Sequence, residues 1–129
     1  MKKTIISTSK APAAIGPYEQ GIRVGSFIFT SGQIPMNPET NELVRGDIGN
    51  ETRQVLKNIS EVLCAGGSSL DNAVKITVYL KDMSNFTRMN EIYQSFFTRN
   101  KPARTCVEVS ELPKEVRVEM DAVAFVEED

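Results

Sequence analysis

Arg104 and Cys106 are the residues whose types and spacing first suggest chemistry. Both lie in the segment KPARTCVEV at residues 101–109, which alternates as a β-strand does. Arg104, Cys106 and Glu108 fall on one face of that strand, so a permanent cation lies two residues from a thiol. The other face carries residues that we expect to join the core: Ala103, Thr105, Val107 and Val109.

Several kinds of catalytic site are excluded because the chain contains no histidine. Ser-His and Cys-His dyads are impossible, and so is a histidine metal site. Cys64 and Cys106 lack the spacing of a zinc site, and no phosphate-binding glycine motif occurs. We therefore expect no metal site, and chemistry limited to Arg, Lys, Glu, Asp, Tyr, Cys, Ser and the backbone.

The composition is that of a globular protein. The 129 residues are 40% hydrophobic and 25% charged, which predicts one domain over residues 1–129. A net charge of −2 without clustered basic residues disfavours nucleic-acid binding. The apolar runs are too short for a secretion signal or a membrane span, and two cysteines do not form a disulfide framework. We expect a soluble, cytoplasmic protein that binds neither nucleic acid nor membrane.

The first half of the chain predicts a hairpin, a loop and a helix. Residues 22–34 indicate two strands around a turn at Gly25-Ser26, and the polar stretch at 35–43 is typical of a loop. A helix is expected from a cap at Asp47 to the pair Gly66-Gly67. Its buried stripe recurs at steps of three and four: Ile48, Thr52, Val55, Ile59 and Val62.

The second half predicts strands at 74–80, 103–109 and 115–126, with a helix between the first two. We expect Ser84 to cap that helix. Its apolar stripe indicates core packing rather than cofactor binding: Phe86, Met89, Tyr93, Phe96 and Phe97.

Two helices can cover only one face of such a sheet, so we expect an α+β fold with the other face uncovered. Val74, Val107, Val118 and Met120 are expected to face the helices. The opposite face would then carry mixed polar residues: Lys75, Thr77, Tyr79, Arg104, Cys106, Glu108, Arg117, Glu119 and Asp121. Composition alone leaves open whether this face is solvated or is an oligomer interface with a polar cleft.

Four segments in order resemble the reactive-intermediate deaminases, the Rid or YjgF family, and in particular its RidA branch. They are APAAIGPYEQG at 11–21, FTSGQIP at 29–35, AGGSSLDNAVKITVYLKDM at 65–83 and PARTCVEVSELPKEVRVEMDAVA at 102–124. The resemblance covers nearly the whole chain. Glu19, Thr105 and the run Asn50-Glu51-Thr52 depart from the usual pattern, and Glu19 would change the charge at the cleft mouth.

The resemblance implies a chorismate-mutase-like fold assembled as a homotrimer, with a central β-barrel and a cleft between each pair of subunits. It implies hydrolysis of 2-imino acids and their enamine tautomers, such as 2-iminopropanoate and 2-iminobutanoate, to 2-keto acids and ammonia. These compounds are released by pyridoxal-phosphate dehydratases, to which it implies a functional link. The implied deaminase carries no cofactor itself.

The resemblance also implies roles for six residues of this chain. Arg104 would hold the substrate carboxylate, and Glu119 would position or deprotonate the attacking water. Cys106 would contribute to catalysis and binding through its backbone rather than as a nucleophile. Three more residues would line the substrate cleft: Tyr18, Ser31 and Gly32.

Structural alternatives exist for these residues. Arg104 would serve equally in an ion pair with Glu108 or Glu119, Cys106 as a small buried residue, and Tyr18 in packing the N-terminal segment.

Two other functions remain open. One is a regulatory module that binds 2-keto acids or other carboxylates without turnover. The other is RNA cleavage, against which the acidic balance and the absence of histidine argue. The sequence does not indicate which imine is preferred.

Overall fold

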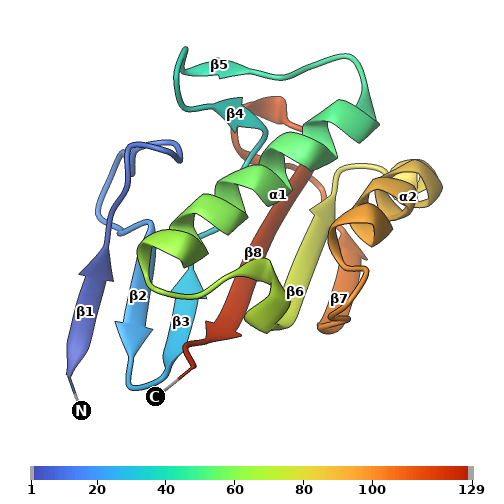
Figure 1. Ribbon diagram of the computed structural model, residues 1–129. Helices are drawn as coiled ribbons and strands as arrows, with labels where there is room; N and C mark the ends of the chain where they lie inside the picture. Colours follow the sequence, from blue (N-terminus) through green and yellow to red (C-terminus); the bar gives the residue numbers. More distant parts are fainter. Residues whose placement is uncertain (1, 128–129) are drawn as a thin grey trace.

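A six-stranded mixed sheet with both helices on one side forms the body of the molecule (Figure 1). The computed structural model describes residues 2–127. The strand order is β1-β2-β3-β8-β6-β7, and only the β6–β7 pair is parallel among these neighbours. This arrangement confirms the expected α+β fold with two helices on one face.

The sheet contains β1 (Lys3–Ile6), β2 (Gly21–Val24), β3 (Phe27–Thr30), β6 (Ala73–Leu80), β7 (Ala103–Glu108) and β8 (Val118–Phe125). The helices are α1 (Ile48–Ala65) and α2 (Phe86–Phe96). Short 3₁₀ turns lie at Leu70–Asn72, Met83–Asn85 and Pro113–Glu115.

The expected hairpin is confirmed as β2 and β3, joined at Gly25-Ser26. Gly25 has a φ of 59°, a left-handed conformation that glycine adopts without a side-chain clash. Strand β1, which pairs with β2, was not expected. Only its last residue, Ile6, is buried, so the segment lacks the alternation that identifies a strand in sequence.

Helix α1 begins and ends where its sequence predicts. The Asp47 carboxylate accepts a hydrogen bond from the Gly49 N–H at 2.8 Å, and the chain leaves the helix through Gly66 and Gly67. The expected stripe is buried throughout: Ile48, Thr52, Val55, Ile59 and Val62.

The expected cap of the second helix is wrong. Asp82, not Ser84, supplies the accepting side chain, which receives the Ser84 N–H at 2.9 Å and starts a 3₁₀ turn ahead of α2. The predicted stripe is only partly buried: Met89, Tyr93 and Phe97 lie in the core. The other two residues, Phe86 and Phe96, are partly buried and pack against the core.

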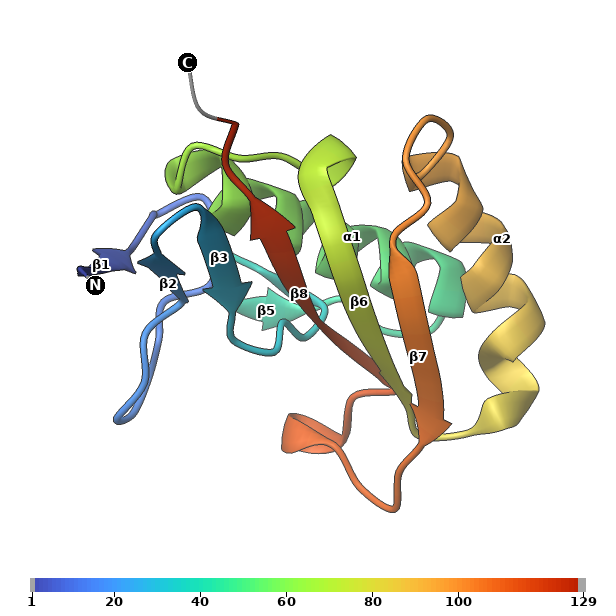
Figure 2. The same cartoon turned by 90° about the horizontal axis from the view of Figure 1, so that it is seen from below.

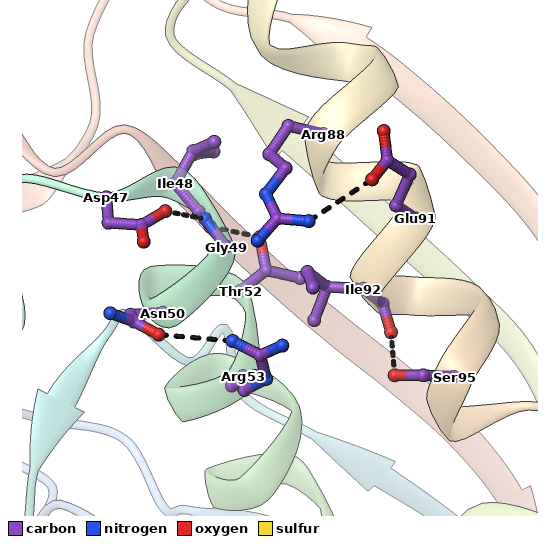
Figure 3. Close-up of polar contacts among 10 residues, drawn as sticks. All are labelled: Asp47, Ile48, Gly49, Asn50, Thr52, Arg53, Arg88, Glu91, Ile92 and Ser95. Atoms are coloured by element: carbon purple, nitrogen blue, oxygen red, sulfur yellow. Dashed lines mark hydrogen bonds and ion pairs between the residues drawn. The ribbon is translucent and has the colours of Figure 1, made fainter.

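The two helices meet where the start of α1 faces α2 (Figure 3). The Arg88 guanidinium of α2 lies against Gly49, so closely that a methyl group there would lie 3.0 Å from Nη2. Arg88 also pairs with Glu91 at 3.2 Å. The small residue at position 49 therefore allows the close approach of α1 and α2.

The loop expected at 35–43 contains a small hairpin of β4 (Met36–Asn37) and β5 (Glu42–Leu43). The buried Asn58 amide of α1 donates to the Ile34 carbonyl at 3.1 Å and to the Met36 carbonyl at 2.9 Å. Each strand is only two residues long, too short for a period of two to be visible in sequence.

Residues on two strands lie on the opposite face from the one expected. Val74 is 38% exposed because the register between β6 and β8 shifts beside it. Val107 is also 38% exposed, whereas Arg104 and Cys106 lie beside buried Ile76 and Val78 of β6. The side of β7 facing the helices is therefore the Arg104 side.

Within residues 2–127, no helix combines the length and apolar character required to cross a membrane.

Candidate functional site

Arg104 lies on the covered face of the sheet, held by side chains of α2. Its Nη1 donates to the Asn90 Oδ1 at 2.6 Å, and its guanidinium carbon lies 4.7 Å from the centre of the Tyr93 ring and 5.6 Å from that of Phe86. Two aromatic faces and an amide therefore fix the cation without neutralising it. In the described part of the chain no carboxylate pairs with Arg104, so neither expected ion-pair partner, Glu108 or Glu119, is bound to it.

A cavity of about 770 Å³ opens between α2 and the start of β7, with Arg104 in its wall. Among residues 2–127, its lining contains two cations and no carboxylate: Asn90, Tyr93, Gln94, Phe97, Thr98, Lys101, Pro102 and Arg104. Such a lining suits an anion, and a planar guanidinium can bind a carboxylate through two parallel hydrogen bonds.

Tyr93 forms part of the floor beneath Arg104. The residue is 7% exposed, its ring packs 4.6 Å from that of Phe97, and its buried hydroxyl has no hydrogen-bond partner within residues 2–127. Burial raises the pKa of Tyr93, opposed by the charge of Arg104. The phenol therefore stays neutral at physiological pH.

Cys106 lies on the same face and packs at the edge of the core. Burial raises the pKa of its thiol, and the opposing effect of the Arg104 charge is smaller. Because the thiolate is the nucleophilic form, a thiol with a raised pKa is a poor nucleophile.

Glu119 lies on the uncovered face of β8, directly opposite Tyr79 of β6. Burial raises the pKa of Glu119, and the negative charge of Asp121 raises it further. The Tyr79 hydroxyl donates to the Asp121 carboxylate at 3.0 Å, which holds that charge in place. A carboxyl group of this kind exchanges protons closer to neutrality than an ordinary glutamate, as a general base requires.

Gly32 contacts the Glu119 carboxylate so closely that a methyl group at position 32 would overlap it. The neighbouring Ser31 hydroxyl donates to the Glu19 carbonyl, and Gln33 bridges to Met120 of β8. Gly32 and Tyr18 also line a second cavity of about 280 Å³. Gly32 thus connects Glu119 to the cavity that Tyr18 lines, with Ser31 next to it in the chain, and we call Tyr18, Ser31, Gly32 and Glu119 the glutamate cluster.

The glutamate cluster and Arg104 lie on opposite faces of the same sheet. The sequence had placed Arg104, Cys106 and Glu119 on one face, and this is wrong because the Arg104 side of β7 packs against α2. One chain therefore holds two separate groups, one suited to carboxylate binding and one to proton transfer.

Two polar contacts of structural weight were not anticipated. Asn90 orients Arg104 through a hydrogen bond. No local sequence pattern predicts such a contact for an asparagine among the aromatic residues of a helix. Glu51, in the run seen only as a variant of α1, is buried and pairs with Arg117 at the start of β8. A glutamate in a helix is normally exposed to solvent, so the sequence did not indicate this ion pair.

Among residues 2–127, no three His, Cys, Asp or Glu side chains are grouped so that they would hold a metal ion.

Residues 8–126 match the family model described as endoribonuclease L-PSP. A RutC family protein of Pyrococcus abyssi is 54% identical over 127 residues, which cover 98% of this chain and 100% of the relative. The 2-iminobutanoate/2-iminopropanoate deaminase of Escherichia coli K12 is 48% identical, with 96% and 98% covered. The crystal structure of E. coli TdcF with bound serine has a TM-score of 0.92 and 42% identity, over 96% of this chain and 99% of TdcF.

Glu119→Gln is expected to raise the free energy of unfolding at pH 7. The raised pKa means that the ionised form of Glu119 opposes folding, so an uncharged amide removes that cost. The gain should shrink as the pH falls through the raised pKa of Glu119 in the folded protein. It should disappear below the ordinary carboxyl pKa, where Glu119 is protonated in both the folded and the unfolded wild type. Urea unfolding at pH 7 and pH 4 measures this.

A variant as stable as the wild type at pH 7 would contradict the assignment. The control is Glu111→Gln, which changes an exposed glutamate.

Cys106 is expected to react slowly with iodoacetamide at pH 7.5 and faster as the pH rises past the ordinary thiol range. The physical reason is the raised pKa of its thiol. Exposed Cys64 would be replaced by serine so that only Cys106 is measured. Rapid alkylation that is already independent of pH near neutrality would reveal a thiolate and reopen a nucleophilic role.

Proposed function

Because this chain belongs to the endoribonuclease L-PSP family, the family of the Rid (YjgF) proteins, we propose that it hydrolyses 2-imino acids to 2-keto acids and ammonia. The observation that carries this proposal is Arg104, a guanidinium fixed in the wall of a cavity where, within the described residues, no carboxylate pairs with it or lines the cavity. The relative of that activity in E. coli is 48% identical over nearly the whole chain.

Arg104 would bind the substrate carboxylate. At a separation of about 4 Å and an effective dielectric constant of about 20, the pair gains about 4 kcal/mol before desolvation is subtracted. That energy suits a small anion that must also be released. Asn90 keeps one guanidinium edge occupied, which leaves the remaining N–H groups for the ligand.

Glu119 would handle the protons of the reaction. Water adds to the carbon of the protonated imine while the carboxylate accepts one of its protons, and a neutral tetrahedral amino alcohol forms. The carboxyl proton then passes to the nitrogen and the C–N bond breaks, while the carboxylate takes the hydroxyl proton as the carbonyl of the keto acid forms. Ammonia leaves, and the proton held by Glu119 is released to water or to the ammonia. General-base assistance of this kind contributes about 100- to 10,000-fold. Gly32, whose missing side chain allows the carboxylate to pack against the backbone, would hold Glu119 in position.

A second copy of the chain would bring Arg104 and Glu119 together, because one sheet separates them within a chain. Support comes from the apolar side chains exposed on the uncovered face. They are Ile5 at 58%, Phe27 and Phe29 at 48% and Val107 at 38%. Such a face is typical of a subunit interface and less so of a solvated sheet. We infer a homotrimer closed into a barrel, with the number three resting on the resemblance to Rid proteins.

Within such a cleft, Tyr18 and Ser31 would form the walls and the Cys106 backbone would contact substrate or water. The substrates would include the imines of 2-oxobutanoate and pyruvate, released in the cytoplasm by pyridoxal-phosphate dehydratases. In the alternative function, the same cleft binds 2-keto acids without turnover, and the assay below separates the two.

Arg104→Ala should abolish the diversion of imine to keto acid. A threonine or serine dehydratase would generate the imine beside an amine trap, and trapped adduct would be measured against keto acid with wild type or variant. The wild type should shift the ratio toward keto acid, whereas Arg104→Ala should leave the uncatalysed ratio because the carboxylate is no longer bound.

Two other outcomes of this assay are informative. A variant as active as the wild type would contradict the role of Arg104. If the wild type has no effect but is stabilised by 2-oxobutanoate according to RT ln(1 + [L]/Kd), the protein is a binding module. Incubation with single-stranded RNA, followed by electrophoresis, tests cleavage in parallel.

Mixed oligomers should show that Arg104 and Glu119 act from different chains. Arg104→Ala and Glu119→Gln should each be inactive alone, but co-expressed subunits should regain about a quarter of the wild-type activity, since random mixing restores one intact pairing in four. The control is the double variant co-expressed with wild type. No recovery on mixing would show that both residues serve one site within a chain, contrary to the arrangement proposed.

A further inference from the structure

Lys101 places a second cation in the wall of the Arg104 cavity. Lys101 lies in the loop that joins α2 to β7, just before the first residue of β7 (Figure 2). In residues 2–127 no carboxylate pairs with Lys101, whereas Arg99 on the same loop pairs with Asp71 at 3.2 Å. The charge of Arg99 is thus partly balanced within the fold, and that of Lys101 is available to a ligand.

The backbone on both sides of Lys101 is fixed. The Asn100 amide donates to the Leu70 carbonyl at 3.2 Å and to the Ala73 carbonyl at 2.8 Å, which ties the loop to the start of β6. Pro102 restricts the chain on the other side, because its ring fixes φ. Lys101 therefore extends a flexible side chain from a defined position, three residues before Arg104.

The cavity is larger and more polar than a three- or four-carbon imino acid requires. Its volume of about 770 Å³ lies in the upper part of the range typical of ligand pockets, about 300–1,000 Å³. Beyond Asn90, the lining offers the Gln94 amide and the Thr98 hydroxyl. A substrate with an aliphatic side chain would leave these groups and Lys101 without a partner.

We propose that Lys101 forms a second anion subsite, and that the preferred substrates are imines of 2-keto dicarboxylic acids. Arg104 would bind the carboxylate next to the imine carbon in two-point contact, and the Lys101 ammonium would bind the carboxylate at the far end of the side chain. This inference rests on the proposed function, because it assigns the far end of the same cavity.

Three keto acids serve as probes for this subsite. 2-Oxoglutarate carries the second carboxylate, its 5-methyl ester replaces that group with a neutral one of similar shape, and 2-oxobutanoate lacks it. Titration calorimetry at low salt should show 2-oxoglutarate binding about two- to fivefold more tightly than its 5-methyl ester, the range for an exposed charge pair. The difference should decline as salt is added.

Lys101→Gln should remove the preference for 2-oxoglutarate over its 5-methyl ester, because the ammonium that would bind the far carboxylate is gone. Arg99→Gln is the matched control, because it removes the same charge from the same loop without altering the cavity lining. That variant should retain the preference. Both positions are exposed, so neither change should prevent folding.

The outcomes separate the two proposals. If the diacid and the ester bind equally, or if Lys101→Gln keeps the preference, the second subsite is wrong while the deaminase proposal stands. If 2-oxobutanoate fails to bind the wild type and the imine assay shows no activity, the proposed function itself is wrong. A loss of preference in Arg99→Gln as large as that in Lys101→Gln would indicate general attraction by the loop, and would also overturn the subsite.

Discussion

The arrangement of the site depends on one constraint: side chains alternate across a sheet that has helices on only one face. Arg104 and Cys106 fall on the covered side of β7, while Glu119 and Asp121 fall on the open side of β8. No adjustment of side-chain rotamers moves a residue through the sheet, since its direction is set by the register. In the proposed deaminase each chain would therefore supply two half-sites on opposite faces, and the exposed aromatic residues mark the open face as the surface that another subunit would cover.

Two arginines show how the surroundings of a cation decide its use. Arg117 pairs with the buried Glu51, and the pair links β8 to α1. Arg104 instead rests on the rings of Tyr93 and Phe86, with Asn90 as its one hydrogen-bond acceptor in the described residues. An aromatic face stabilises a guanidinium without consuming its N–H groups, so the charge stays available to an anion. The first arginine is structural, and the second keeps N–H groups that no side chain among residues 2–127 is shown to occupy.

The sequence predicted the elements better than it predicted their faces. The stripe of α1, the turn at Gly25-Ser26 and the two helices on one side follow from periodicity and turn chemistry, which are local properties. The orientation of β7 does not follow from them. Hydrophobicity alone predicts that the Val107 side of this strand faces the helices and that the Arg104 side faces away. The long arginine side chain occupies the covered face by stacking on α2, a tertiary contact that no local pattern encodes. For the same reason no local pattern indicates the contacts of Asn90 and Glu51. Arg104 and Glu119 are proposed as site residues through the family resemblance.

The position of β8 has a consequence for how the chain folds. This strand is the last of the sheet in sequence, yet it lies between β3 and β6, so Phe29 pairs with Val123 across most of the chain length. Until β8 has been synthesised, the amino-terminal hairpin has no place on the sheet, and β6 lacks its antiparallel neighbour. Pairings between such distant segments close large loops and slow the search for the native state. During translation the unpaired edges of β3 and β6 would be exposed together, which makes this interval the one in which the nascent chain is most prone to aggregate.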